Sequence, residues 1–341
     1  MFCKRFRAKT MSQPIAPLPR DRVLQSHPFE ICGVDFTGPL FVRESTGTKT
    51  SYLLLLTCAV TRAVHLELCG SMTVPSFIQA FQRFSARRGL PRIIYSDNFR
   101  TFKKAAKDIR AIINVFTNPT LQDYYTQLNI TWKFNVELAP WWGGFWERQV
   151  KTVKDCLRRV LGRSCLEYQE LETVVAQVEA IVNSRPLTYV SESPEDFNPL
   201  TPSHLLTGRM LTALPPLSQL PTVGSDGSHH SNLHHQWLYL STILDSFWKR
   251  WSNEYLQFLR SAYMTPSRQA VEPEEGELVL LKKQGAPRTV WPLARVLKVF
   301  PGKDGHSRAC EIRLPNGKTL KRPTAALYRL ELPPSAASSA T

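Results

Sequence analysis

Apolar runs of strand length, separated by clusters of turn-forming residues, are the feature that most restricts how this sequence can fold. Three such runs follow one another at residues 29–42, 51–57 and 63–68, and a turn-type cluster at 44–49 separates the first two. Consecutive strands joined by short connections usually lie side by side in one sheet. The segment from residue 29 onward therefore begins with three neighbouring strands.

Helical spacing of apolar residues begins after these strands. A helix opens at Thr73-Val-Pro75 and carries Phe77, Phe81 and Phe84 at helical intervals. Two short strands and three more helices follow, the strands at 92–95 and 130–134, and the helices at 102–116, 145–161 and 170–183. This order predicts an α/β fold, with a five-stranded mixed sheet and flanking helices.

The last third of the chain has a different pattern. Residues 186–229 are rich in Pro, Ser, Thr and Gly, and residues 236–262 read as an aromatic, Leu-rich helix. Short strands joined by turns such as Asn316-Gly317 then predict a small all-β barrel. We therefore expect a basic arm or linker (1–28), an α/β core (29–190), an irregular connection with a helix (191–265), a basic β-barrel (266–332) and a disordered tail (333–341).

Positive charge is concentrated at the two ends of the chain, whose net charge is +15. Residues 1–25 hold six Lys or Arg against one acid, and residues 276–332 hold twelve against four. Between residues 30 and 200 twenty bases nearly balance seventeen acids. Basic ends around a near-neutral middle indicate segments that bind a polyanion beside a catalytic or structural core, although a basic protein without such a partner has the same composition.

Cysteine usage and hydropathy bear on where the protein works. None of the seven cysteines forms a Cys-x-x-Cys pair, and no signal peptide is recognisable at the start. The longest apolar run, residues 52–60, is too short to span a bilayer. These features favour free thiols in a reducing compartment and a soluble protein of the cytosol or nucleus.

Three carboxylates stand out by their local setting. Asp35 lies inside an otherwise apolar strand, where a charge is costly unless it is paired or bound to a metal. Asp97 follows the strand at 92–95, and Glu147 lies in the first turn of a helix behind the aromatic loop Pro140-Trp-Trp-Gly-Gly-Phe-Trp146. Singly, they could be an edge-strand surface residue, a helix cap and a first-turn acid. Together they predict a site for two divalent cations.

Several motifs around these acids resemble those of integrases from BEL/Pao-type LTR retrotransposons, members of the retroviral integrase superfamily. The resemblance covers roughly residues 12–332 and rests on the segments Gly33-Val-Asp-Phe-Thr-Gly-Pro39, Tyr95-Ser-Asp-Asn98, Ala139-Pro-Trp-Trp-Gly-Gly-Phe-Trp-Glu147, Ile181-Val-Asn-Ser-Arg-Pro-Leu187 and Leu200-Thr-Pro-Ser-His-Leu-Leu206. The two gaps between the acids, of 61 and 49 residues, also resemble those of this group. Phe99-Arg100 depart from the family, which usually has a small residue after the second acid.

The resemblance implies a ribonuclease-H-like core followed by a Src-homology-3-like DNA-binding barrel. It implies a DDE-type DNA integrase, a nucleotidyltransferase with endonuclease activity that trims 3′-ends and transfers strands. Asp35, Asp97 and Glu147 would be both catalytic and metal-binding, with two Mg²⁺ or Mn²⁺ ions per site. The expected partners are element-end and target DNA and further copies of the chain, in the nucleus. An intact N-terminal zinc domain is expected to be missing, since only Cys3 could be a remnant.

Basic residues predict where DNA would bind. Lys151, Lys154 and Arg158 share one helix face with Glu147, as DNA contacts or as a solvated row of ion pairs. In the family the two lysines at these offsets contact DNA ends, a role that Lys151 and Lys154 would inherit. Further DNA contacts are expected in the barrel at Lys282, Lys283, Lys321 and Arg322. Zinc is not expected at the paired histidines of residues 229–235, which lack further ligands.

Two alternative functions fit parts of the pattern. A catalytically silent or domesticated integrase-derived protein that binds DNA or chromatin would keep the same fold and charge. A ribonuclease H normally needs a fourth acid and has no use for a basic barrel. The three acids favour an integrase, and the missing zinc domain favours the silent protein.

Overall fold

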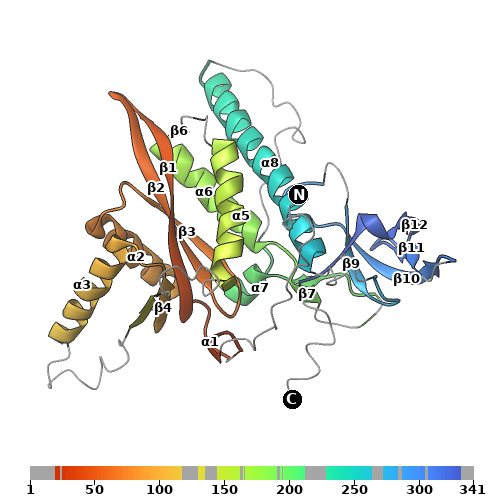
Figure 1. Ribbon diagram of the computed structural model, residues 1–341. Coiled ribbons are helices and arrows are strands. Elements are labelled where there is room, and N and C mark those ends of the chain that lie inside the picture. Colours follow the sequence, from red (N-terminus) through yellow and green to blue (C-terminus); the bar gives the residue numbers. More distant parts are fainter. Residues whose placement is uncertain are drawn as a thin grey trace, which may run out of the picture.

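The structure is a computed structural model that describes residues 20–23, 25–116, 130–134, 144–161, 164, 166–189, 193, 195–211, 228–262, 272–282, 286–303 and 306–331 (Figure 1). At residues 22, 110–116, 144–150 and 228–236 it describes the backbone alone. The predicted tail (333–341) therefore lies outside the described residues, as do residues 1–19 and 24 of the predicted arm. No helix within the described ranges is long and apolar enough to cross a membrane.

A mixed sheet forms the centre of the first two thirds of the chain, in the order β3-β2-β1-β4-β5. Its strands are β1 (Ile31–Glu44), β2 (Gly47–Cys58), β3 (Val64–Cys69), β4 (Ile93–Ser96) and β5 (Thr131–Phe134). The first three pair antiparallel, and β4 and β5 run parallel to β1. The predicted mixed sheet is confirmed, with a sixth short strand, β6 (Leu166–Glu167), added beside β1.

Helices cover both faces of this sheet (Figure 1). One face carries α2 (Val74–Arg88) and α3 (Arg100–Phe116), and the other carries α5 (Gly144–Leu161) and α6 (Tyr168–Asn183). The four consecutive leucines 53–56 of β2 show why: Leu54 and Leu56 pack in the core under α2, whereas Leu53 and Leu55 pack under α5 and α6. A strand that is buried on both faces reads as a continuous apolar run.

A second, all-β sheet follows at the C-terminal end, with antiparallel strands in the order β12-β11-β10-β9-β13. Its strands are β9 (Leu278–Leu281), β10 (Leu293–Pro301), β11 (Ser307–Arg313), β12 (Thr319–Pro323) and β13 (Leu327–Arg329). The predicted Asn316-Gly317 turn joins β11 to β12, and Gly317 supplies a φ of 78°. Glycine adopts this conformation without strain.

The long helix α8 (Ser228–Ala262) joins the two sheets into one packed body (Figure 1). Its Trp248 and Tyr255 rings meet Trp291 of the C-terminal sheet edge-on, at 4.8 and 5.2 Å between centroids. Trp251 and Leu259 pack in the core that α5 and α6 form on the first sheet. The chain also forms short elements: α1 (Arg20–Val23), β7 (Thr188–Tyr189), β8 (Pro199–Leu200), α7 (Pro202–Thr207) and the 3-10 helix η6 (Thr324–Ala326).

Candidate active site

Asp35 and Asp97 lie on neighbouring parallel strands. Val34 of β1 pairs with Ser96 of β4, so each aspartate is the next residue after a paired position. Asp97 stands where β4 ends, and its Oδ1 accepts a hydrogen bond from the Phe99 amide at 3.1 Å. This side-chain turn redirects the chain into α3, as expected for an Asp at a turn. The structure thus brings the first two predicted acids to neighbouring strands, where β4 ends beside the middle of β1.

Asp35 points from β1 toward helix α5. Its Oδ2 accepts a hydrogen bond from Lys154 Nζ at 2.6 Å, and the two side chains are 25% and 19% exposed. Burial raises the pKa of Asp35 above its usual range, the Lys154 ammonium opposes this, and the nearby Asp97 carboxylate raises it further. A partly buried carboxylate beside a second one favours a compensating cation.

Helix α5 carries the third predicted acid. Glu147 lies near its start, two helical turns before Lys154, and its side chain lies outside the described residues. Lys151 and Arg158 are exposed on the surface of α5, whereas Lys154 turns inward to Asp35. Val153 and Leu157 of the same helix are buried and pack against the first sheet. The predicted DNA contact of Lys154 remains a prediction, because the structure pairs its ammonium with a carboxylate.

The residues at the end of β4 and in the middle of β1 fit a divalent cation. Asp35 and Asp97 offer carboxylate oxygens, the ligands that Mg²⁺ and Mn²⁺ prefer. Lys154 Nζ shows that a positive charge is accommodated 2.6 Å from an Asp35 oxygen. Among the described side chains no group of three or more His, Cys, Asp or Glu could hold a metal ion. The predicted set therefore depends on Glu147 as its third member.

The predicted DNA contacts of the barrel lie on the second sheet, away from α5. Lys321 and Arg322 are exposed on β12, and Lys282 is exposed just after β9. Lys321 Nζ lies 5.1 Å from the centroid of the Phe300 ring. Lys283 lies outside the described residues, as do the side chains of the paired histidines at 229–235. Among the described residues, Lys282, Lys321 and Arg322 lie on or beside the second sheet, whereas Asp35 and Asp97 lie on or beside strands of the first.

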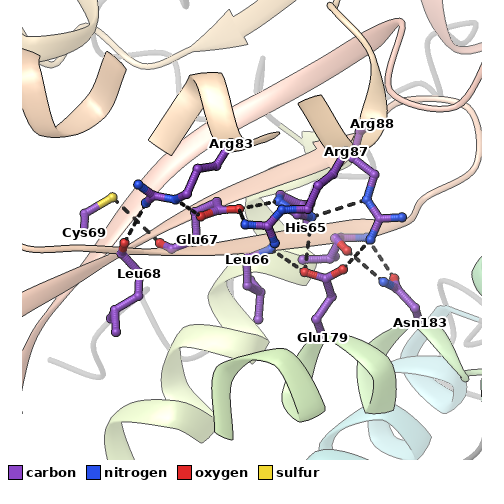
Figure 2. A network of polar contacts seen from close by, with 11 residues as sticks. His65, Leu66, Glu67, Leu68, Cys69, Arg83, Arg87, Arg88, Glu179 and Asn183 are labelled. Atoms are coloured by element: carbon purple, nitrogen blue, oxygen red, sulfur yellow. Dashed lines mark hydrogen bonds and ion pairs between the residues drawn. The ribbon is translucent and has the colours of Figure 1, made fainter. Parts of the chain in front are cut away.

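A polar network that was not predicted from the sequence lies at the edge strand β3 of the first sheet (Figure 2). His65 of β3 contacts Glu67 through Nε2 at 3.0 Å and Glu179 of α6 through Nδ1 at 3.2 Å. Arginines of α2 complete it: Arg88 pairs with Glu179 at 2.6 Å, and Arg83 and Arg87 pair with Glu67 at 2.8 and 2.9 Å. Clusters of this kind can mark functional sites or structural ion-pair networks.

The contacts of this network with β3 assign it a structural role. Glu179 accepts a hydrogen bond from the Leu66 amide, Asn183 bonds both the amide and the carbonyl of Val64, and Arg83 donates to the Leu68 carbonyl. These are backbone groups of an edge strand, which would otherwise be open to pairing with another chain. The signal in the sequence was two charged residues, 65 and 67, alternating within an apolar strand.

We expect protonated His65 to make stability depend on pH. Burial lowers the pKa of His65, but hydrogen bonds to Glu179 and Glu67 outweigh it, so the pKa is raised. Because the pKa of His65 is higher in the folded than in the unfolded chain, protonation of His65 stabilises the fold. This stabilisation is fully present at a pH below the pKa of the unfolded chain, and it is lost as the pH rises through the pKa of the folded chain. Denaturant unfolding across neutral and mildly alkaline pH should therefore show a decline of about 2 kcal/mol, the scale of a hydrogen bond to a charged group.

His65→Gln should remove most of this decline, whereas His306→Gln, at an exposed position, should leave it unchanged. A decline that persists in His65→Gln would assign the pH dependence to another group.

Comparisons with known proteins give one family and a set of solved structures. A family described as "Family of unknown function (DUF5641)" matches residues 235–330, which run from α8 to the end of the C-terminal sheet. No curated protein matches the sequence significantly. Three similar solved structures are of retroviral integrases, at 14%, 17% and 18% identity.

Three of these structures illustrate the similarity. The simian T-cell lymphotropic virus intasome, in complex with PP2A regulatory subunit B56 gamma, is 14% identical with a TM-score of 0.36, covering 94% of this chain and 86% of that one. The HTLV-2 integrase catalytic core in complex with magnesium, in its trimeric form, is 17% identical with a TM-score of 0.32, covering 53% and 97%. Its dimeric form is 18% identical with a TM-score of 0.29, covering 46% and 88%.

Proposed function

We propose that this chain is a BEL/Pao-type retrotransposon integrase, which processes DNA 3′-ends and joins them to target DNA. The observation that carries the proposal is the placement of Asp35 and Asp97 at equivalent positions of adjacent parallel strands, under the helix that contains Glu147. These residues belong to three motifs, far apart in the sequence, that resemble those of integrases. The proposal implies DNA ends and target DNA as partners, a homomultimer and action in the nucleus.

The chain's own side chains would hold the metal and the DNA. Asp35, Asp97 and Glu147 are the proposed ligands for Mg²⁺ or Mn²⁺. When bound, two such ions lower the pKa of the attacking water or 3′-hydroxyl and offset negative charge at the reacting phosphodiester. Lys151 and Arg158, exposed on the same helix, are placed to bind successive phosphates, and Lys154 sits closest to the reacting group.

A strand-transfer assay tests this function. The full chain is incubated with the element's own terminal DNA and a target duplex, in Mg²⁺ and separately in Mn²⁺. We expect joined products that disappear when the metal is chelated. DNA binding without products in either metal would instead favour the silent, integrase-derived DNA- or chromatin-binding protein.

The C-terminal sheet is expected to contribute electrostatic DNA binding. Each phosphate that a Lys or Arg neutralises changes the slope of log affinity against log salt by about 0.9. Lys321→Ala with Arg322→Ala should therefore flatten that slope by about two units in the full chain, if both side chains contact phosphate. Arg43→Ala with Lys49→Ala, exposed on the first sheet, is the matched control and should leave the slope unchanged. Equal slopes for parent and the Lys321–Arg322 variant would place DNA elsewhere.

A further inference from the structure

A groove of about 600 Å³ lies beside the C-terminal sheet, away from the three acids. Its described walls are mainly apolar, formed among others by Phe197, Leu281, Val290, Trp291, Leu293 and Leu320. Val290 is 50% exposed, so one apolar side chain of the lining is open to solvent. The volume lies within the usual range of ligand-binding pockets.

One wall of the groove is fixed to helix α8. Trp248 Nε1 donates to the Ala286 carbonyl at 3.1 Å, and Arg288 pairs with Asp245 at 3.1 Å although its own side chain is only 5% exposed. Between these anchors and Val290, Thr289 has a φ of 64°. A positive φ is strained for a β-branched residue and persists only where the surroundings impose it, often beside a ligand.

Another part of the lining, Phe197, is held by Arg295 of β10. Its Nη2 donates to the carbonyls of Ser193 and Asp196 at 2.8 and 2.9 Å, and its guanidinium lies 6.0 Å from the centroid of the Phe197 ring. This fixes the segment that carries Phe197 onto the sheet. Because both parts of the lining are anchored before anything binds, a ligand would lose little free energy in ordering the groove.

The charges at the groove are of one sign. Lys282 and Arg322 belong to its lining, and none of the described lining residues is acidic. Both were predicted from sequence as phosphate contacts. Duplex DNA would satisfy the two cations but would leave the apolar walls uncovered, since its outer surface is phosphate and sugar.

We propose that this groove binds an extended segment of a partner protein in which bulky apolar residues stand next to acidic ones. The apolar side chains would fill the space over Trp291 and Leu293, and the acidic ones would pair with Lys282 and Arg322. This matches the usual anatomy of a binding site, an apolar centre with a polar, charged rim. The groove thus recruits a protein, independently of the DNA chemistry proposed for the acids.

The test measures binding of a fluorescent peptide pool to the full chain. The pool consists of twelve-residue peptides that mix Asp and Glu with Leu, Ile, Phe and Val; one control pool replaces the apolar residues by Ser, and another replaces the acids by their amides. We expect binding by the first pool alone. Binding no stronger than that of the Ser pool overturns the proposal.

Two matched variants locate the site. Val290→Asp places a repelling charge in the groove and should weaken peptide binding at least about tenfold, as for a central contact. Leu297→Asp makes the same change at a residue that is 41% exposed on the same sheet but outside the groove, and should weaken it less than about twofold. Val290→Ser should also weaken peptide binding, though by less. It replaces Val290→Asp in the test if Val290→Asp does not fold.

Equal effects of Val290→Asp and Leu297→Asp would contradict the groove as the site. A single-stranded oligo-dT whose binding falls with Val290→Asp, but not with Leu297→Asp, would assign the groove to nucleic acid and overturn the protein partner.

Discussion

Asp97→Asn is expected to lower strand transfer at least about a hundredfold while leaving duplex affinity almost unchanged. Substituting a residue that only supports a metal ligand lowers metal affinity or activity about 10–100-fold. Removing the charge of a ligand itself should lower activity by at least as much. The substitution should not disturb the fold, because Asn keeps the Oδ1 that accepts the Phe99 amide. DNA affinity should persist, since the cationic surfaces are untouched.

Asp196→Asn is the matched control. Asp196 makes the same kind of turn, with its Oδ1 accepting the Asn198 amide at 2.9 Å, but it lies outside the candidate site. Both variants lose one negative charge and keep their turn, so only Asp97→Asn should lose activity. Full activity in Asp97→Asn would remove Asp97 from the mechanism.

Glu331→Gln is expected to destabilise the whole chain by about 3–5 kcal/mol, the usual cost of breaking a buried ion pair. Glu331 follows β13 and pairs with Arg185, which follows α6, at 3.1 Å, and with Arg62, between β2 and β3, at 2.5 Å. The Arg185 side chain is only 1% exposed, so neutralising Glu331 removes a negative charge that balances a buried cation.

The same ion pair should make the free energy of unfolding decrease at acidic pH. Burial raises the pKa of Glu331, but Arg185 and Arg62 outweigh it, so the pKa is lowered. The stabilisation by ionised Glu331 is fully present at a pH above its pKa in the unfolded chain. It is lost as the pH falls through the pKa of Glu331 in the folded chain. Chemical unfolding of the parent and Glu331→Gln at neutral and acidic pH should therefore converge in acid.

Glu195→Gln is the control for the buried pair. Glu195 pairs with Arg313 at 3.0 Å but is 81% exposed, so its loss should cost less than about 1 kcal/mol. Equal costs for the two substitutions would mean that Glu331 does not hold the C-terminal sheet to the core.

Local pattern was enough to predict most of the fold. Strand-length apolar runs gave β1 to β5, helical spacing gave α2 and α6, and Asn316-Gly317 gave the hairpin between β11 and β12. These features depend on near neighbours in the chain. The two-residue strand β6 was not predicted, because it forms only by pairing with β1 at Val42 and Arg43.

The site was harder to predict because its contacts join distant residues. Sequence indicated that Asp35 and Asp97 stand at strand positions suited to a ligand, and the register of β1 with β4 brings them together. Nothing in the spacing showed that Lys154 would turn from the solvated face of its helix to a carboxylate 119 residues away. The joining of Glu331 to Arg185 likewise depends on packing over 146 residues.

Manganese binding at the candidate site tests the central claim most directly. Crystals of the full chain grown with Mn²⁺ would locate the ion by its anomalous scattering. The proposal predicts anomalous density against carboxylate oxygens of Asp35 and Asp97, with Glu147 completing the site and the Lys154 ammonium moved off Asp35. Ordered Asp35 and Asp97 with no manganese beside them, and Lys154 still paired with Asp35, would contradict a metal-dependent active site.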